Sequence, residues 1–132
     1  MLDTTTWTTK RWGRVIHRRD MSCLLVNAGY RCSRHYHRHK INLFGVASGS
    51  LLIVEWDERD DTTPRRTILN PGDVCAVNAN VDHLFCVIES GLVVERYVSD
   101  NGQPVRADDI YRLDKGGKMQ DGELERLRGQ ST

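Results

Sequence analysis

The stretch "SRHYHRHKIN", Ser33–Asn42, holds three of the chain's five histidines at alternate positions, His35, His37 and His39. Successive side chains of a β-strand point to opposite faces, so alternate residues share one face. Three imidazoles on one strand face serve core packing poorly, whereas imidazole is a common ligand for transition metals. The stretch therefore predicts a strand that carries a metal or ligand site.

Short strands separated by turn signals surround this stretch, a pattern typical of an all-β sandwich or barrel. We expect strands over residues 23–30, 32–39, 42–49, 50–56, 67–78, 83–91 and 92–99, and no long helix before residue 108. Gly49 predicts a tight hairpin, and Pro71-Gly72-Asp73 predicts a turn in which proline sets φ and glycine accepts a positive φ. The charged loop over 57–66 either caps the barrel mouth or is solvated, and we expect it to be solvated.

The bulk composition limits the classes of function. The 132 residues suit one domain with a sizeable core, and 19 basic against 18 acidic residues argue against a dedicated nucleic-acid binder. No apolar run is long enough to span a membrane, and the N-terminal residues contain no secretory signal, so we expect a cytoplasmic protein. The four cysteines form no CxxC pair and are expected to be reduced.

The spacing of Gly29, His35, His37, Asn42 and Gly49 resembles the first motif of the cupins. The later run "NPGDVCAVNANVDHLF", which contains His83, resembles the second motif. The resemblance implies an all-β, single-domain cupin jelly-roll β-barrel in which His35, His37 and His83 bind a metal. Cupins carry a glutamate where this chain has Asn42, and a neutral amide binds a metal more weakly than a carboxylate does.

Two points about this metal site stay open. A strand register can present either His35 and His37 or His37 and His39 as the metal pair, because a shift of one residue moves every side chain to the other face. Asn42 can contact either the metal or the substrate. The ligand set indicates a divalent transition metal without distinguishing Zn, Mn, Fe, Ni and Co. Its uncompensated positive charge favours an anionic ligand.

The chain also resembles the cupin domain of type II mannose-6-phosphate isomerases, which is often fused to a mannose-1-phosphate guanylyltransferase. The signals are "KRWG" (10–13), "ADDIYRLDKGGK" (107–118) and the run Gly29, Ser33, His37, His39, Asn42, Val46, Ser48 and Gly49. They predict a cupin domain with an N-terminal strand or arm over 1–119, followed by a polar tail over 120–132 that is a short helix or disordered. The sequence lacks the nucleotidyltransferase domain, so we expect no guanylyltransferase activity.

The first functional hypothesis is a metal-assisted isomerase that acts on a sugar phosphate. Aldose–ketose isomerisation needs a base and an electrophile. Glu95 is the candidate base if its side chain points into the barrel rather than to solvent. Arg112 either binds the phosphate or forms a salt bridge with Asp109 or Asp114. His39 and Lys40 are candidate substrate contacts at the barrel mouth, together with Arg112.

Other hypotheses use the same histidines differently. A non-catalytic module would bind a sugar or a small anion, and an Fe(II) dioxygenase would use the three imidazoles for oxygen chemistry. A scaffold without chemistry is a further alternative. For all of them we expect a homodimer that pairs through the N-terminal strands, with Trp7 and Trp12 at the interface, because an exposed sheet edge favours pairing.

Overall fold

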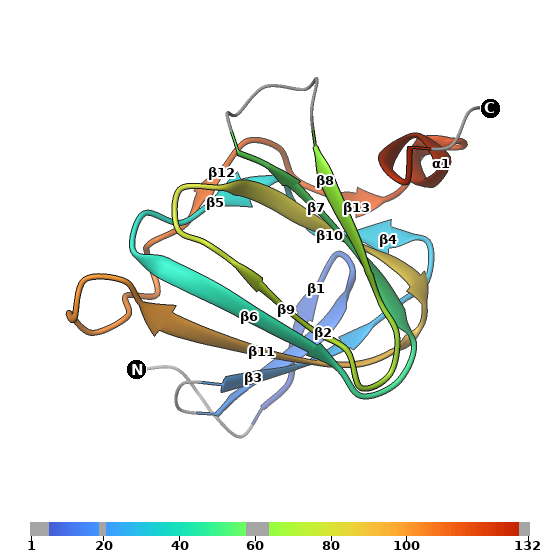
Figure 1. The fold of residues 1–132 in the computed structure, drawn as a ribbon. Helices are drawn as coiled ribbons and strands as arrows, with labels where there is room; N and C mark the ends of the chain where they lie inside the picture. The colour runs from blue at the N-terminus through green and yellow to red at the C-terminus, as the bar shows by residue number, and fades with distance from the viewer. Residues whose placement is uncertain (1–5, 19–20, 58–63, 130–132) are drawn as a thin grey trace.

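The structure, a computed structural model, describes residues 6–18, 21–57 and 64–129 and consists of two antiparallel sheets that face each other (Figure 1). The first sheet has the strand order β1 (Thr8–Lys10), β2 (Gly13–Arg18), β3 (Met21–Val26), β11 (Gly91–Ser99), β6 (Lys40–Val46) and β9 (Val74–Val77). The second contains β4 (Tyr30–Arg31), β5 (His35–Tyr36), β7 (Ser50–Trp56), β8 (Arg65–Leu69), β10 (Asp82–Glu89), β12 (Tyr111–Arg112) and β13 (Gly117–Lys118).

Alternation along β6 defines the inner face of the first sheet. Its sequence "KINLFGV" buries Lys40, Asn42, Phe44 and Val46 and leaves the residues between them partly exposed. Strand β7 is buried at every position, which places it in the centre of the second sheet between β10 and β8. The apolar part of the barrel fills with these side chains, whereas Lys40 and Asn42 make one end of the inner face polar.

The turns lie where glycine predicted them. Gly49, between β6 and β7, has a φ of 80°, and a Cβ there would lie 2.5 Å from the carbonyl oxygen of Glu89. Gly72 has a φ of 93° in the turn between β8 and β9. Both positions therefore need a backbone that other residues rarely adopt.

The predicted strand over 32–39 is wrong in its length, because only His35 and Tyr36 form β5. After β5, the chain is held by contacts from distant segments. The carbonyl of His37 accepts a hydrogen bond from Asn80 N, and the carbonyl of His39 accepts one from Asp100 N. These contacts bend the chain out of the sheet before β6 begins.

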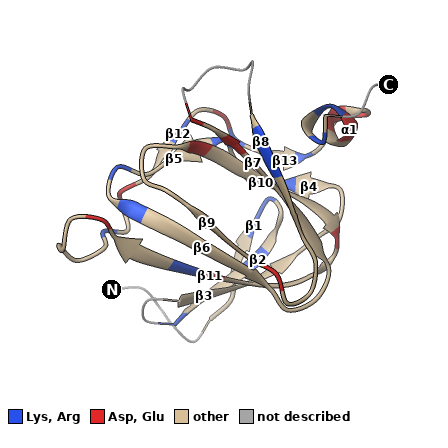
Figure 2. Cartoon of the chain, in the orientation of Figure 1, with Lys and Arg blue, Asp and Glu red and all other residues tan. Residues whose placement is uncertain are grey.

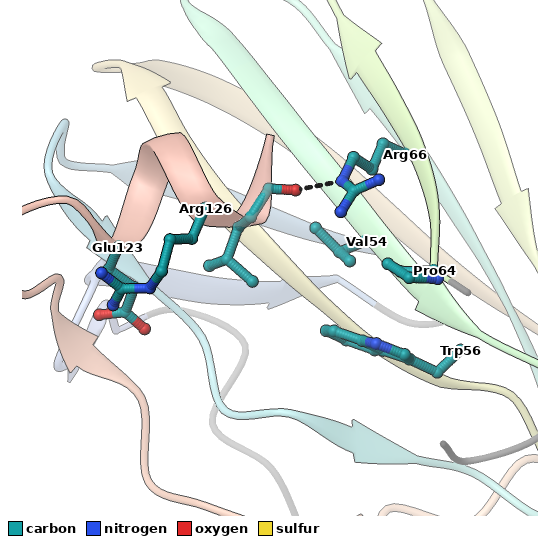
Figure 3. Close-up of a pocket in the computed structure, with 7 residues that line it drawn as sticks. Val54, Trp56, Pro64, Arg66, Glu123 and Arg126 are labelled. Carbon is teal, nitrogen blue, oxygen red and sulfur yellow. Dashed lines mark hydrogen bonds between the residues drawn. The ribbon is translucent and has the colours of Figure 1, made fainter. Parts of the chain in front are cut away.

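A short helix, α1 (Glu123–Leu127), packs outside the barrel near β8 and β13 (Figure 1). Leu124 and Leu127 contact the apolar core, and Arg31 forms ion pairs with Asp114 and Glu123 at 3.1 and 2.8 Å. A hollow of about 240 Å³ lies beneath the helix and is lined by Val54, Trp56, Pro64, Arg66, Glu123, Arg126 and Leu127. Figure 3 shows the side chains that line it. No candidate site residue from the sequence lines this hollow.

Four expectations concern the surface. Acidic and basic residues are interspersed over the same strands and loops (Figure 2), in line with a net charge of +1. Within the described ranges, no helix has the length and apolarity needed to cross a bilayer.

Most of the charged loop expected over 57–66 lies outside the described residues. The exposed strand β1 forms the edge of its sheet, so homodimer formation through this edge stays a prediction.

Candidate metal centre

Three histidines converge inside one end of the barrel. His83 on β10 lies directly opposite His35 on β5 in the strand register, and His37 follows β5 by one residue. All three side chains are buried, and one nitrogen from each lies within 4.8 Å of the other two. The prediction that these three side chains converge is therefore confirmed, and a cluster of this size can hold a metal ion.

A backbone carbonyl contacts the Nδ1 atom of each of the three rings. The Nδ1 atoms lie 2.7, 2.6 and 2.9 Å from the carbonyl oxygens of Ser33, Asp109 and Val81, for His35, His37 and His83 respectively. A carbonyl only accepts, so each Nδ1 carries the hydrogen and each Nε2 keeps its lone pair. Ring orientation by a backbone carbonyl is the usual support of a metal-ligating histidine.

The Nε2 of His37 tests whether a metal fits. This atom is fully buried and has no hydrogen-bond partner among the described residues. A buried polar atom without a partner is costly, and a metal ion bound at Nε2 would remove that cost. The donor set of three imidazoles suits a transition metal.

Burial keeps these imidazoles neutral. Burial is the largest cause of a lowered pKa in all three rings. The pKa of His35 lies well below 6.5, that of His37 lies below 6.5, and that of His83 falls to about 4. Neutral imidazole is the form that ligates metals. At neutral pH the cluster is therefore ready to bind an ion without first losing protons.

The first sheet faces the histidines with a polar group of its own, made of Asn42, Glu95 and Tyr97. Asn42 and Tyr97 are opposite each other on β6 and β11, and Glu95 lies two residues before Tyr97 on the same face. Asn42 Nδ2 donates to Glu95 Oε2 at 3.3 Å and lies 3.4 Å from the Nε2 of His83. Asn42 Oδ1 is buried and has no hydrogen-bond partner in the part of the chain that the structure describes.

Glu95 therefore points into the barrel rather than to solvent. The hydroxyl of Tyr97 donates to its Oε1 at 2.9 Å. Burial raises the pKa of the Glu95 carboxyl, although the hydrogen bonds from Tyr97 and Asn42 oppose the shift. Burial also raises the pKa of Tyr97 well above 10, so its hydroxyl keeps its proton as a donor to Glu95.

The other predicted contacts lie further out. His39 is not part of the cluster, because its side chain is 61% exposed and its Nδ1 lies 3.3 Å from Asp100 Oδ1. The register that pairs His37 with His39 is therefore wrong, since His35 occupies the inner position with His37. Lys40 is buried, with its ammonium 4.5 Å from the centre of the Tyr97 ring.

Arg112 lies in β12, opposite His35 in the strand register, and is exposed. Within the described ranges it forms no ion pair with Asp109 or Asp114. The Asp109 carboxylate accepts from the backbone N–H groups of Arg38 and His39, and Asp114 pairs with Arg31. A role in phosphate binding remains a prediction for Arg112.

Sequence reasoning missed two residues of the site. Tyr97 holds Glu95 and packs its ring 5.6 Å from that of His37, and Asp109 supplies the carbonyl that orients His37. The position of Tyr97 two residues after Glu95 was an available signal, because alternate residues of a strand share a face. No local pattern indicates the contact of Asp109, which is 72 residues away from His37.

Comparison with solved structures supports the fold. The capsular polysaccharide assembling protein CapF from Staphylococcus aureus matches with a TM-score of 0.65 and 19% identity over 83% of this chain and 31% of that one. Oxalate decarboxylase from Bacillus subtilis matches with a TM-score of 0.61 and 12% identity over 83% and 30%. KdgF from Halomonas sp. matches with a TM-score of 0.58 and 21% identity over 78% and 91%.

These proteins have the cupin fold, so the predicted jelly-roll barrel is confirmed. The chain spans about a third of the length of the CapF chains that it matches. No protein-family model and no curated protein matches the sequence. At these identities the comparisons carry the fold alone, and the chemistry must be argued from the site itself.

Proposed function

We propose that the chain is a metal-dependent enzyme that isomerises a sugar phosphate or a closely related anionic sugar. One observation carries the proposal. Three neutral imidazoles, each with the lone pair of its Nε2 turned away from the backbone carbonyls, share the barrel interior with an inward carboxylate, Glu95. The site thus combines a place for an electrophile with a candidate base, the two components that aldose–ketose isomerisation requires.

His35, His37 and His83 would hold the divalent transition metal, and Asn42 is placed to contact the metal or the substrate. When bound, the metal supplies a Lewis acid that polarises a substrate carbonyl. The ligand types do not distinguish Zn, Mn, Fe, Ni and Co.

Glu95 performs the proton transfer in this proposal. Its carboxylate takes a proton from the hydroxyl-bearing carbon beside the substrate carbonyl and returns it to the carbonyl carbon, while the hydroxyl proton passes to the former carbonyl oxygen. Burial raises the pKa of this carboxyl, which brings it closer to neutral pH and makes it a stronger base than a solvated glutamate. Tyr97 and Asn42 fix its two oxygens through their hydrogen bonds, so the base keeps one position. Arg112 and Lys40 are the candidate contacts for the substrate's anionic group.

Asn42 favours a second candidate function, binding without catalysis. With an amide in place of the cupin carboxylate, the centre has only neutral ligands, and a bound ion keeps its full charge for an anionic ligand. The barrel would then bind a sugar or a small anion and leave it unchanged.

The deciding experiment incubates metal-loaded protein with mannose 6-phosphate and follows the sugar signals by NMR. Conversion to the ketose, lost in Glu95→Gln and kept in the exposed control Lys118→Met, supports the isomerase. Binding of the sugar phosphate without conversion contradicts the isomerase and favours the binding module. Oxygen uptake by the Fe(II)-loaded protein would instead indicate the dioxygenase alternative.

A further inference from the structure

A second cavity lies at the polar end of the barrel, next to the histidine cluster. It has a volume of about 430 Å³, within the range of small-molecule sites. Its lining residues are His39, Lys40, Ser99, Asn101, Gln103, Pro104, Val105, Arg106 and Asp109. None of the three clustered histidines lines it, so the cavity is a separate feature of the described residues.

Strand register relates the cavity to the centre. Lys40 and Ser99 are opposite each other on β6 and β11, two residues from the pair Asn42 and Tyr97 on the same strands. Alternate residues share a face, so Lys40 and Ser99 continue the inner face of the barrel by one step. The ring of Tyr97 lies between the cavity and the histidine cluster. Its centre is 4.5 Å from the Lys40 ammonium and 5.6 Å from the centre of the His37 ring.

Among the described residues, the charges at the cavity leave the Lys40 ammonium without a carboxylate at ion-pair distance. His39 lies against Asp100, and the guanidinium of Arg106 pairs with Asp108. Both oxygens of Asp109 accept backbone N–H groups. Lys40 is only 5% exposed and forms no ion pair within the part of the chain that the structure describes. The carboxylates of Asp109, Glu95 and Asp108 attract this ammonium without contacting it, so an anion bound in the cavity would give Lys40 a partner at ion-pair distance.

We infer that this cavity binds the anionic group of a small molecule, a phosphate or a carboxylate, with Lys40 as the principal contact. Ser99, Asn101 and Gln103 supply polar groups around the anion, and Pro104 and Val105 supply an apolar wall for attached carbon atoms. The inference rests on the proposed function where it concerns the substrate. The cavity would then hold the anionic group of the isomerase substrate, on the other side of the Tyr97 ring from the metal site.

The test is calorimetric titration of the protein with inorganic phosphate, mannose 6-phosphate and neutral mannose, without and with the metal. The variants are Lys40→Met, which keeps the apolar stem without the charge, and Lys40→Arg, which keeps the charge. Lys118→Met is the matched control, because this exposed lysine lies in β13, away from the cavity. Circular dichroism checks that each variant folds.

We expect phosphate and mannose 6-phosphate to bind the wild type and Lys118→Met alike, with mannose much weaker. Lys40→Met should lose about tenfold or more in affinity for both anions, and Lys40→Arg should lose less. Equal binding by folded Lys40→Met, or no binding of either anion to the wild type, overturns the inference. If the wild type binds the anions in a Lys40-dependent way but does not convert mannose 6-phosphate, the proposed isomerase is overturned and the anion site is still supported.

Discussion

At the scale of single residues, the polar side of the centre combines an amide on β6 with a carboxylate on the neighbouring strand β11. In the cupin motif that the sequence resembles, a glutamate corresponds to Asn42, whereas here Glu95 on β11 supplies a carboxylate next to this amide. The amide lies between that carboxylate and the Nε2 of His83. A negative charge is thus present in the barrel, but the Asn42 amide separates it from His83.

Moving this carboxylate back to β6 should strengthen metal binding. The change is Asn42→Glu combined with Glu95→Gln, because two carboxylates at this spacing would oppose each other's ionised form. We expect the double variant to bind Mn or Zn about tenfold more tightly than the wild type, since an anionic ligand attracts a divalent ion more strongly than an amide. Competition with a chelating dye measures it. Affinity equal to or below that of the wild type would contradict the assignment of Asn42.

The buried imidazoles should make the metal-free protein sensitive to acid. Unfolded histidines take up protons near pH 6.5, whereas His83 in the fold does so only at about pH 4. The unfolded state binds more protons in this window, so the free energy of unfolding falls as the pH drops below about 6.5. His83 alone contributes a loss of roughly 3 kcal/mol.

Urea denaturation in the presence of a chelator measures this slope at several pH values. His83→Gln should flatten it, and His39→Gln, which changes an exposed side chain, should leave it as in the wild type. A His83→Gln variant with the full wild-type slope would show that the acid sensitivity arises elsewhere.

At the scale of elements, local patterns predicted the strands better than their ends. The alternation in β6 and the glycines at the turns were readable, because each depends on neighbouring residues only. The early end of β5 was not readable, because Asn80 and Asp100 hold that segment from other strands' loops. The inward direction of Glu95 likewise follows from the pairing of β11 with β3 and β6, which the sequence left open.

The turn between β9 and β10 shows this dependence at the site. Asn80 has a φ of 64°, its N–H donates to the carbonyl of His37, and its side chain donates to the carbonyl of Arg38. It therefore holds the His37 segment close to the strand that carries His83. The left-handed backbone costs a β-branched residue more than it costs asparagine or glycine.

We expect Asn80→Val to lower the free energy of unfolding by about 1–2 kcal/mol and to weaken metal binding. Asn80→Gly, which accepts the same φ, should retain most of the stability. Thermal unfolding and metal titration measure both effects. If valine and glycine behave alike, the backbone of this turn is not what holds His37 in place.

At the scale of the whole molecule, the C-terminal segment packs against the barrel through partly buried side chains. The sequence suggested a polar tail over 120–132, yet Leu124 and Leu127 in α1 pack against the core, and Glu123 pairs with Arg31. The apolar character of the two leucines was visible in the sequence, but the core residues against which they pack follow only from the fold.

Removal of residues 121–132 should therefore destabilise the barrel by about 2 kcal/mol, the cost of exposing two partly buried leucines and the surface beneath them. Urea denaturation measures the change, and the milder Glu125→Gln serves as a control because Glu125 is exposed and lies on the same helix. A truncated chain as stable as the full one would place the end of the folded domain near residue 120.

The central claim is that the three histidines bind one metal ion, and metal analysis tests it most directly. The protein is purified without chelator, and its metal content is measured beside His37→Ala, His83→Ala and the exposed control His39→Ala. The account predicts close to one transition-metal ion per chain in the wild type and in His39→Ala, and its loss in the other two variants. A wild type that is empty and does not take up Mn, Fe, Co, Ni or Zn would contradict it.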